Sequence, residues 1–177
     1  MIDMDTGRDV PWDGAALGEL QVRGPYITGG YYNDPDESEK FIDGWLRTGD
    51  VATIDPEGYI QLVDRTKDLV KSGGEWISSV ELENHLMAHP AVLEAAVVGI
   101  AHPRWQERPV AAIVPRPGSP RPEAEELREF LATKVAKWWL PDEFIFLESI
   151  PKTSVGKFAK LRLRAELGQL VTEDTFG

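Results

Sequence analysis

The chain contains no cysteine and has few cations for its 177 residues. Without cysteine there are no disulfides, no thiol catalysis and no cysteine-based zinc sites, which fits a reducing compartment, and we expect a cytoplasmic protein. Nineteen Lys and Arg stand against 30 Asp and Glu, a formal net charge of −11. General nucleic-acid binding requires a basic surface, so nucleic acid is not an expected partner.

Long hydrophobic runs are also absent. The longest apolar stretch runs from Ala95 to Ala101, whereas a membrane-spanning helix needs ~20 apolar residues. Association with a membrane surface cannot be read from these residues. A hydrophobic content of 42% and a charged content of 28% are typical of a globular protein with a core of its own.

One segment combines charges, a glycine pair and an aromatic residue between two stretches of regular pattern. It reads Asp64-Arg65-Thr66-Lys67-Asp68-Leu69-Val70-Lys71-Ser72-Gly73-Gly74-Glu75-Trp76-Ile77-Ser78. Charges beside a Gly-Gly pair suit a joint that bends and presents backbone amides to an anion. On chemistry alone, a phosphate-facing hinge and a solvated connector both stay open.

Three segments resemble, in order and spacing, motifs of the adenylate-forming (AMP-binding) enzymes, and most closely those of fatty acyl-CoA synthetases. They are the run 64–78, Trp45-Leu46-Arg47-Thr48-Gly49-Asp50 and Pro151-Lys152-Thr153-Ser154-Val155-Gly156-Lys157. Residues 24–33 are also similar, and the resemblance extends from about residue 17 to about residue 167. Three spaced motifs in the right order are far more specific than any one of them alone.

The resemblance implies an acid–thiol ligase that uses ATP, a fatty acid and CoA. Such an enzyme forms acyl-AMP and then transfers the acyl group to the CoA thiol. Mg²⁺ is expected with ATP, and its protein ligand is expected in a large N-terminal domain. That domain carries a phosphate loop rich in Ser, Thr and Gly, and no such loop occurs in this sequence. We therefore expect the C-terminal part of a ligase, inactive by itself, with the missing domain as its protein partner.

Two alternatives remain beside the fatty-acid–CoA ligase. One is another acyl- or aryl-adenylating ligase, and the other is a non-catalytic module that only binds a nucleotide or CoA. The sequence Gly-Gly-Glu-Trp-Ile-Ser at 73–78 favours the fatty acyl-CoA branch. The acyl pocket belongs to the absent domain, so the chain length of the substrate is not encoded in these residues.

The resemblance places the ATP ribose on Asp50 and Arg65. A carboxylate accepts two hydrogen bonds and suits a pair of hydroxyl groups; the alternative for Asp50 is a turn residue that caps its own backbone. For Arg65 the alternative is a surface ion pair with Asp64 or Asp68, worth under ~1 kcal/mol.

Further roles follow from the same resemblance. Lys67, Lys71 and Trp76 would lie against the nucleotide, although solvated lysines and a core tryptophan are equally open. Asp64 would be the hinge residue, whose backbone angles absorb a rotation of the small domain.

The glycine pair has a specific implied role. Gly73, Gly74 and Glu75 would line the tunnel for the pantetheine arm of CoA, because only a backbone without side chains leaves room for it. The alternative is a loose turn.

Lys157 is the implied catalytic residue. Its ammonium would reach the carboxylate and α-phosphate oxygens as charge develops, which is worth about 3 kcal/mol in the transition state. It belongs to a stretch of cations without an acid, and such a corner of an acidic protein suggests an anionic ligand or only a solvated helix. The cations are Lys152, Lys157, Lys160, Arg162 and Arg164.

No metal site is predicted. His85 and His89 have the i, i+4 spacing of some zinc ligands, but no Glu follows His85 directly.

The patterns predict an α+β protein in two parts. Residues 1–63 are mostly β and form the end of the large domain, 64–72 form the hinge, and 73–177 form a small mobile α+β domain. Its helices are predicted after the capping box Ser78–Glu81, over 123–135 and over 158–167. Its three-stranded sheet comes from the strands 92–100, 108–114 and 143–147.

Overall fold

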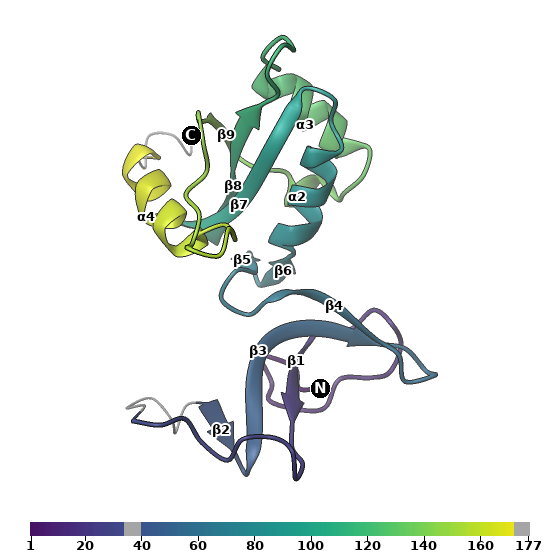
Figure 1. Cartoon of the computed structure of the whole chain (residues 1–177). Coiled ribbons are helices and arrows are strands. Elements are labelled where there is room, and N and C mark those ends of the chain that lie inside the picture. Colours follow the sequence, from purple (N-terminus) through teal and green to yellow (C-terminus); the bar gives the residue numbers. More distant parts are fainter. Residues whose placement is uncertain (34–39, 172–177) are drawn as a thin grey trace. The chain divides into compact units, whose positions relative to one another are not determined.

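The computed structural model describes residues 1–33 and 40–171 of the chain. The chain divides into two compact units, unit 1 over Met1–Lys67 and unit 2 over Asp68–Gly177, and each is described by itself (Figure 1). The boundary falls inside the predicted hinge segment, of which only 66–69 lie outside strands. Within the described ranges, no helix is both long and apolar enough to cross a membrane.

Unit 1 is built around one long central strand. The strands are β1 (Gly18–Val22), β2 (Phe41–Ile42), β3 (Trp45–Ile54) and β4 (Ile60–Arg65). The other three all pair antiparallel with β3. The sequence patterns predict two short strands, 45–47 and 51–54, where the structure has the single β3, which is strongly curved (Figure 1). Gly49 inside it has φ 71, a backbone angle that glycine adopts without strain.

Unit 2 contains a mixed sheet of five strands. They are β5 (Val70–Ser72), β6 (Glu75–Ile77), β7 (Val92–His102), β8 (Gln106–Pro115) and β9 (Glu143–Phe146). The order is β6-β5-β8-β7, and β9 pairs with β8 in parallel. The α+β class is confirmed, and the three predicted strands are β7, β8 and β9. The hairpin β5–β6 extends that sheet; its strands of three residues are too short to show a pattern.

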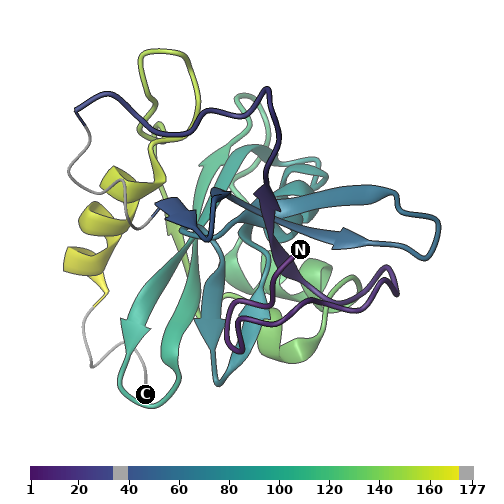
Figure 2. The ribbon, with the colours of Figure 1, turned by 90° about the horizontal axis from the view of Figure 1, so that it is seen from below.

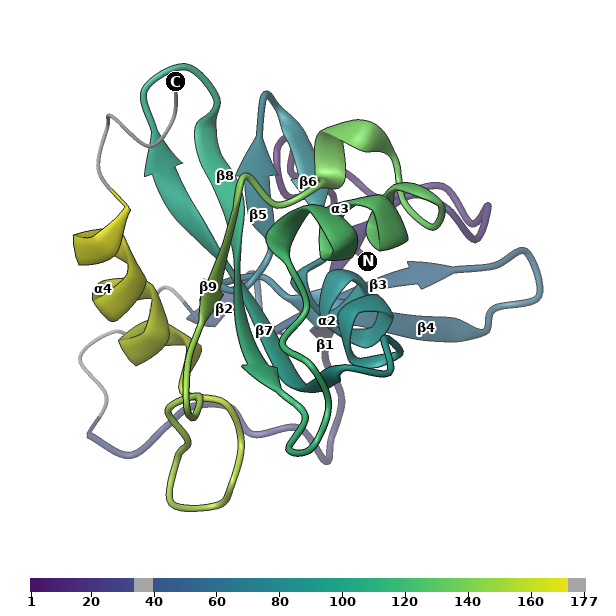
Figure 3. The ribbon, with the colours of Figure 1, turned by 90° about the horizontal axis from the view of Figure 1, so that it is seen from above.

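Helices cover both faces of this sheet. They are α2 (Ser79–Met87), α3 (Ala124–Ala132), α4 (Lys160–Leu170) and the short η1 (Lys137–Trp139). Figures 2 and 3 show α4 on one side of the sheet and α3 on the other. Alternate residues of β7 therefore enter two cores: Val97 packs with the leucines of α2 and α3, and Val98 with those of α4. A strand buried on both faces is apolar throughout, which explains the run at 95–101.

Candidate functional site

In unit 1 the structure joins Asp50 and Arg65. The pairing of β3 with β4 sets the two residues opposite each other, and Arg65 Nε lies 2.9 Å from Asp50 Oδ1. Arg65 Nε also donates to the Gly49 carbonyl at 3.2 Å. The Asp50 side chain keeps 34% of its surface exposed. Arg65 thus holds a carboxylate that solvent and ligands still reach. The structure shows Arg65 in an ion pair with Asp50, whereas the sequence analysis considered Asp64 or Asp68 as its partner.

The predicted hinge residue Asp64 is part of a strand. It lies in β4 opposite Val51 and is buried, with 8% of its surface exposed. Its Oδ1 accepts a hydrogen bond of 2.7 Å from the Arg65 backbone N–H. Lys67 is exposed in the turn that follows. The segment that joins the two units is therefore short, and Asp64 fixes the backbone immediately before it.

In unit 2 the structure joins Lys71 and Trp76. They face each other across the hairpin β5–β6, and Lys71 Nζ lies 4.4 Å from the centroid of a Trp76 ring. A cation at this distance over an aromatic face is attracted by the ring. Trp76 is partly buried, and its ring has Lys71 as a partner.

Gly73 and Gly74 form the two-residue turn of this hairpin. Their φ angles are 61 and 89, and two successive positive φ angles match the twist of a tight hairpin. Gly73 donates to the Trp105 carbonyl at 2.9 Å, and a Cβ on it would come within 3.1 Å of the Trp105 ring. A Cβ on Gly74 would meet nothing within 4 Å. The tip of the turn, with the exposed Glu75 behind it, is open.

Trp105 was missed in the sequence analysis. It lies on the connection between β7 and β8, and the pairing of Ser72 with Gln106 brings it to the glycine turn. Arg104 lies over its ring at 4.5 Å from the centroid. The contact between Trp105 and the glycine turn depends on the register between β5 and β8, so no local sequence pattern predicts it.

Arg108 was also missed, and it holds the base of the hairpin. Its Nη1 donates to Ser72 Oγ at 3.0 Å and to the Trp138 carbonyl at 2.9 Å. Its Nη2 lies 2.7 Å from Asp142 Oδ1 and donates to the Leu140 carbonyl at 3.0 Å. A guanidinium with this many acceptors is rigidly oriented. The glycine turn therefore extends from a fixed base.

Lys157 lies at the end of a closed loop just before α4. Thr153 N–H donates to the Lys157 carbonyl at 2.7 Å, and Ala159 N–H donates to the Pro151 carbonyl at 2.8 Å. The Lys157 N–H donates back to Thr153 Oγ1 at 3.2 Å. Gly156 has φ 82, which accounts for glycine at that motif position. The backbone of Lys157 is fixed while its side chain is exposed.

The other cations near Lys157 are largely neutralised. Carboxylates from distant elements pair with Lys152 (Glu94) and Lys160 (Glu83), and Arg162 pairs with Glu166 one turn along α4. Lys157 forms no ion pair with any residue in the part of the chain that the structure describes. Three of the five cations in the predicted basic corner are thus paired with carboxylates, and the exposed Lys157 is not paired within the described residues.

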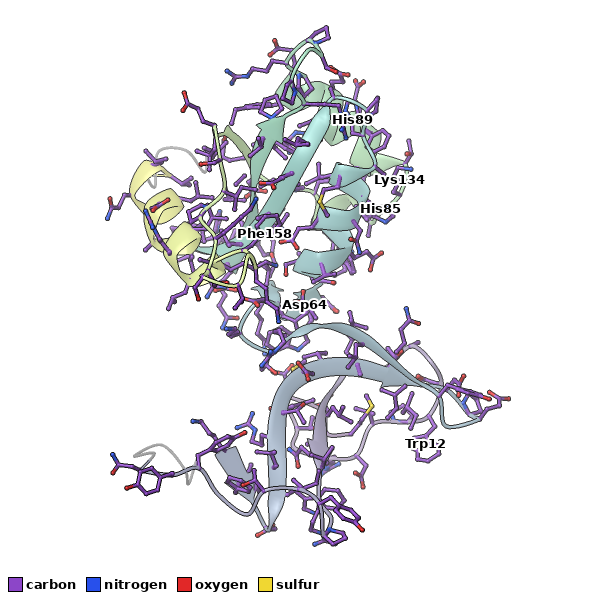
Figure 4. All side chains as sticks on the ribbon, viewed as in Figure 1. Trp12, Asp64, His85, His89, Lys134 and Phe158 are labelled. Atoms are coloured by element: carbon purple, nitrogen blue, oxygen red, sulfur yellow. The ribbon has the colours of Figure 1, made fainter. Side chains whose placement is uncertain are left out.

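The histidines take part in packing. His85 Nε2 lies 3.8 Å from Glu81 Oε1, and the buried His89 lies against the Phe130 ring, with its Nε2 3.3 Å from Glu126 Oε1 (Figure 4). Across residues 1–33 and 40–171, no group of three or more His, Cys, Asp or Glu side chains is arranged to hold a metal ion.

Comparison with known proteins identifies the family. Residues 81–157 match the family described as the AMP-binding enzyme C-terminal domain. The chain contains the C-terminal domain of an AMP-binding, adenylate-forming enzyme. This agrees with the resemblance carried by the three motifs, of which 151–157 lies inside the matched residues and 45–50 and 64–78 lie outside them.

Relatives match nearly the whole chain. It is 58% identical over 165 residues to a long-chain-fatty-acid–CoA ligase of Thermus thermophilus, covering 92% of the chain and 30% of that enzyme. It is 48% identical over 168 residues to a 3-methylmercaptopropionyl-CoA ligase of Ruegeria lacuscaerulensis, with 95% and 31% covered. The structure of ATP-bound MatB from Rhodopseudomonas palustris matches with a TM-score of 0.85 and 32% identity, over 97% of this chain and 34% of that one. The chain thus spans about 30% of the length of the curated relatives that it matches.

Proposed function

We propose that the chain is the C-terminal part of an ATP-dependent fatty-acid–CoA ligase. The observation that carries the proposal is the 58% identity to a long-chain-fatty-acid–CoA ligase, which extends over both units. The geometry supports it, since unit 1 presents the exposed carboxylate of Asp50 and unit 2 presents Lys157 and the open glycine turn. We place the reaction in the cytoplasm, with the remaining domain of the ligase as the protein partner.

In the first half-reaction, a carboxylate oxygen of the fatty acid attacks the α-phosphorus of ATP. The new P–O bond gives acyl-AMP, and the bond to pyrophosphate breaks. Asp50 accepts hydrogen bonds from the ribose hydroxyls while Arg65 keeps its carboxylate in place. Lys157 places a positive charge beside the oxygens on which negative charge develops. Trp76, with Lys71 over its ring, offers an aromatic face to the nucleotide, and Lys67 a further cation. Mg²⁺ would accompany ATP and take its ligands outside the described residues.

In the second half-reaction, the CoA thiol attacks the acyl carbonyl, a C–S bond forms, and AMP leaves as its C–O bond breaks. The pantetheine arm passes the backbone of Gly73 and Gly74, next to Glu75. The turn over 66–69 lets unit 2 reorient between the two half-reactions. Asp64 is the residue at which this rotation begins.

The choice of acid separates this proposal from its main rival. One relative is a 3-methylmercaptopropionyl-CoA ligase, so not every relative of this chain is named for a fatty acid. A parent enzyme that contains this chain is expected to exchange pyrophosphate into ATP most strongly with fatty acids and to release their CoA thioesters. The 177-residue chain alone is expected to remain at background, because no phosphate loop occurs in it.

A panel of fatty, aryl and short-chain acids decides the matter. Preference for an aryl acid would assign the chain to another adenylating branch. Acyl-AMP formation by the isolated chain would contradict the proposal that the missing domain is required for this step. If the parent binds nucleotide or CoA without any turnover, the chain is part of a non-catalytic binding module.

Asp50→Ala in the parent enzyme is expected to raise the KM for ATP. Loss of hydrogen bonds to a charged acceptor costs about 1.5–3 kcal/mol, which is roughly 10–150-fold in affinity. Steady-state kinetics at saturating fatty acid measure it, with Asp55→Ala as the control, because Asp55 Oδ1 caps a turn of the same sheet at the Tyr59 N–H. An unchanged KM in Asp50→Ala would reduce Asp50 to a partner of Arg65.

A further inference from the structure

A buried ion pair lies where α4 begins. Lys160, the first residue of α4, has its Nζ 2.6 Å from Glu83 Oε1 and donates to Ser79 Oγ at 2.7 Å. Glu83 and Ser79 both belong to α2. The Lys160 and Glu83 side chains are only 12% and 8% exposed. The pair thus joins two helices that contribute to different cores of unit 2.

The same carboxylate also fastens the edge of the sheet. Glu83 Oε1 accepts a hydrogen bond of 2.8 Å from the Val97 N–H. Val97 lies in β7, which is the last strand in the order of the sheet. The network therefore connects α4, α2 and β7 at one point.

Stability alone does not explain a charged pair at this point. Removing two charges from water is costly, and a buried ion pair adds little stability compared with apolar residues of similar size. What directed, charge-assisted hydrogen bonds supply is a defined position. The remaining buried anchors of α4, Leu163 and Leu167, are apolar and lack such directional bonds.

The position that Lys160 defines is that of the catalytic loop. Lys157 lies three residues before Lys160. Lys157 belongs to the loop 151–159, which is closed by the hydrogen bond from the Ala159 N–H to the Pro151 carbonyl. α2, on the other side of the pair, follows directly after β6 and so after the glycine turn. One network thus joins the loop of Lys157 to the element that continues from the hairpin.

We propose that Lys160, together with Glu83 and Ser79, is a positioning device for Lys157. Lys160 acts through the start of α4 and touches no substrate itself, so it is a positioning residue. The proposal rests on the function proposed above. The proposal predicts an effect on acyl-AMP formation and none on CoA transfer, because the glycine turn is held separately by Arg108 and Trp105.

The test replaces both charges at once in the parent enzyme. A single Lys160→Met leaves Glu83 buried without its partner, which destabilises the fold. The double variant Lys160→Met/Glu83→Gln avoids this and keeps an acceptor for Val97. We expect kcat for acyl-AMP formation to fall about 10²-fold, the cost of a misplacement of about 1 Å. The KM for ATP and the transfer from pre-made acyl-AMP to CoA should stay unchanged, and Lys160→Arg should retain most of the activity.

The matched control is Arg162→Met/Glu166→Gln. It removes an ion pair from the same helix, but one that is exposed and joins no second element. Normal acyl-AMP formation by Lys160→Met/Glu83→Gln would overturn the proposal, as would an equal loss in both half-reactions.

A second readout does not depend on activity. Hydrogen exchange at the amides of Thr153, Gly156 and Ala159 should become about tenfold faster in the Lys160→Met/Glu83→Gln variant, while exchange at Ala112 in the sheet stays constant. Unchanged exchange in the loop would contradict a positioning role. If the unsubstituted parent forms no acyl-AMP, the proposed function fails, and the exchange data still decide whether the network holds the loop.

Discussion

Lys157→Ala in the parent enzyme is expected to lower the rate of acyl-AMP formation by about 10²–10³-fold, the usual effect of removing one preorganised charge that stabilises a transition state. Transfer of the acyl group from pre-made acyl-AMP to CoA should be nearly unaffected, since in the proposed mechanism the lysine acts only in the first half-reaction. Pyrophosphate exchange measures the first half-reaction, and thioester formation from synthetic acyl-AMP measures the second.

The surroundings of Lys157 make this test clean. The side chain is exposed and forms no ion pair within the described residues, so its truncation costs the fold little. The loop geometry is maintained by backbone groups and by Thr153 Oγ1, all of which remain in the variant. Lys134→Ala, an exposed lysine of the same unit beyond α3 (Figure 4), is the control and should keep both activities. Equal losses in both half-reactions of Lys157→Ala would give the lysine a structural role.

The sequence predicted the elements that local patterns determine. The apolar run at 95–101 is the middle of β7, in which residues 95–100 are buried. Ser78 does cap α2, and its Oγ accepts the Glu81 N–H at 3.1 Å. The motif residues were predicted from a resemblance, and the structure adds a physical reason at several of them, for example the positive φ angles of Gly49 and Gly156.

Contacts between distant residues were beyond the sequence patterns. Lys160 and Glu83 are 77 positions apart, and no acid stands between Lys152 and Arg164 in the sequence, so the local composition predicted a basic corner. Arg108 contacts Ser72 over 36 positions. Such pairs depend on the sheet order and the placement of helices, which neither hydrophobic periodicity nor local charge specifies.

Gly74→Leu is expected to block the second half-reaction selectively. The substituted side chain would extend from the open tip of the turn, where a Cβ on Gly74 meets nothing within 4 Å. It would therefore leave the fold intact and obstruct the pantetheine arm. Acyl-AMP should form at close to the normal rate and accumulate, while transfer to CoA falls steeply. Gly73 is unsuited to this test, because its Cβ would press against the Trp105 ring.

Backbone strain is the competing explanation, and the chain supplies a control for it. Gly74 has φ 89, so any leucine there costs ~1–2 kcal/mol in folding. Gly118 has φ 80 in an exposed loop and equally open surroundings, so Gly118→Leu carries the same strain away from the hairpin. Both variants should show a similar, small decrease in Tm, and only Gly74→Leu should lose CoA transfer. If Gly74→Leu instead loses both half-reactions and melts well below Gly118→Leu, the glycine pair is a structural turn, and the pantetheine arm takes another path.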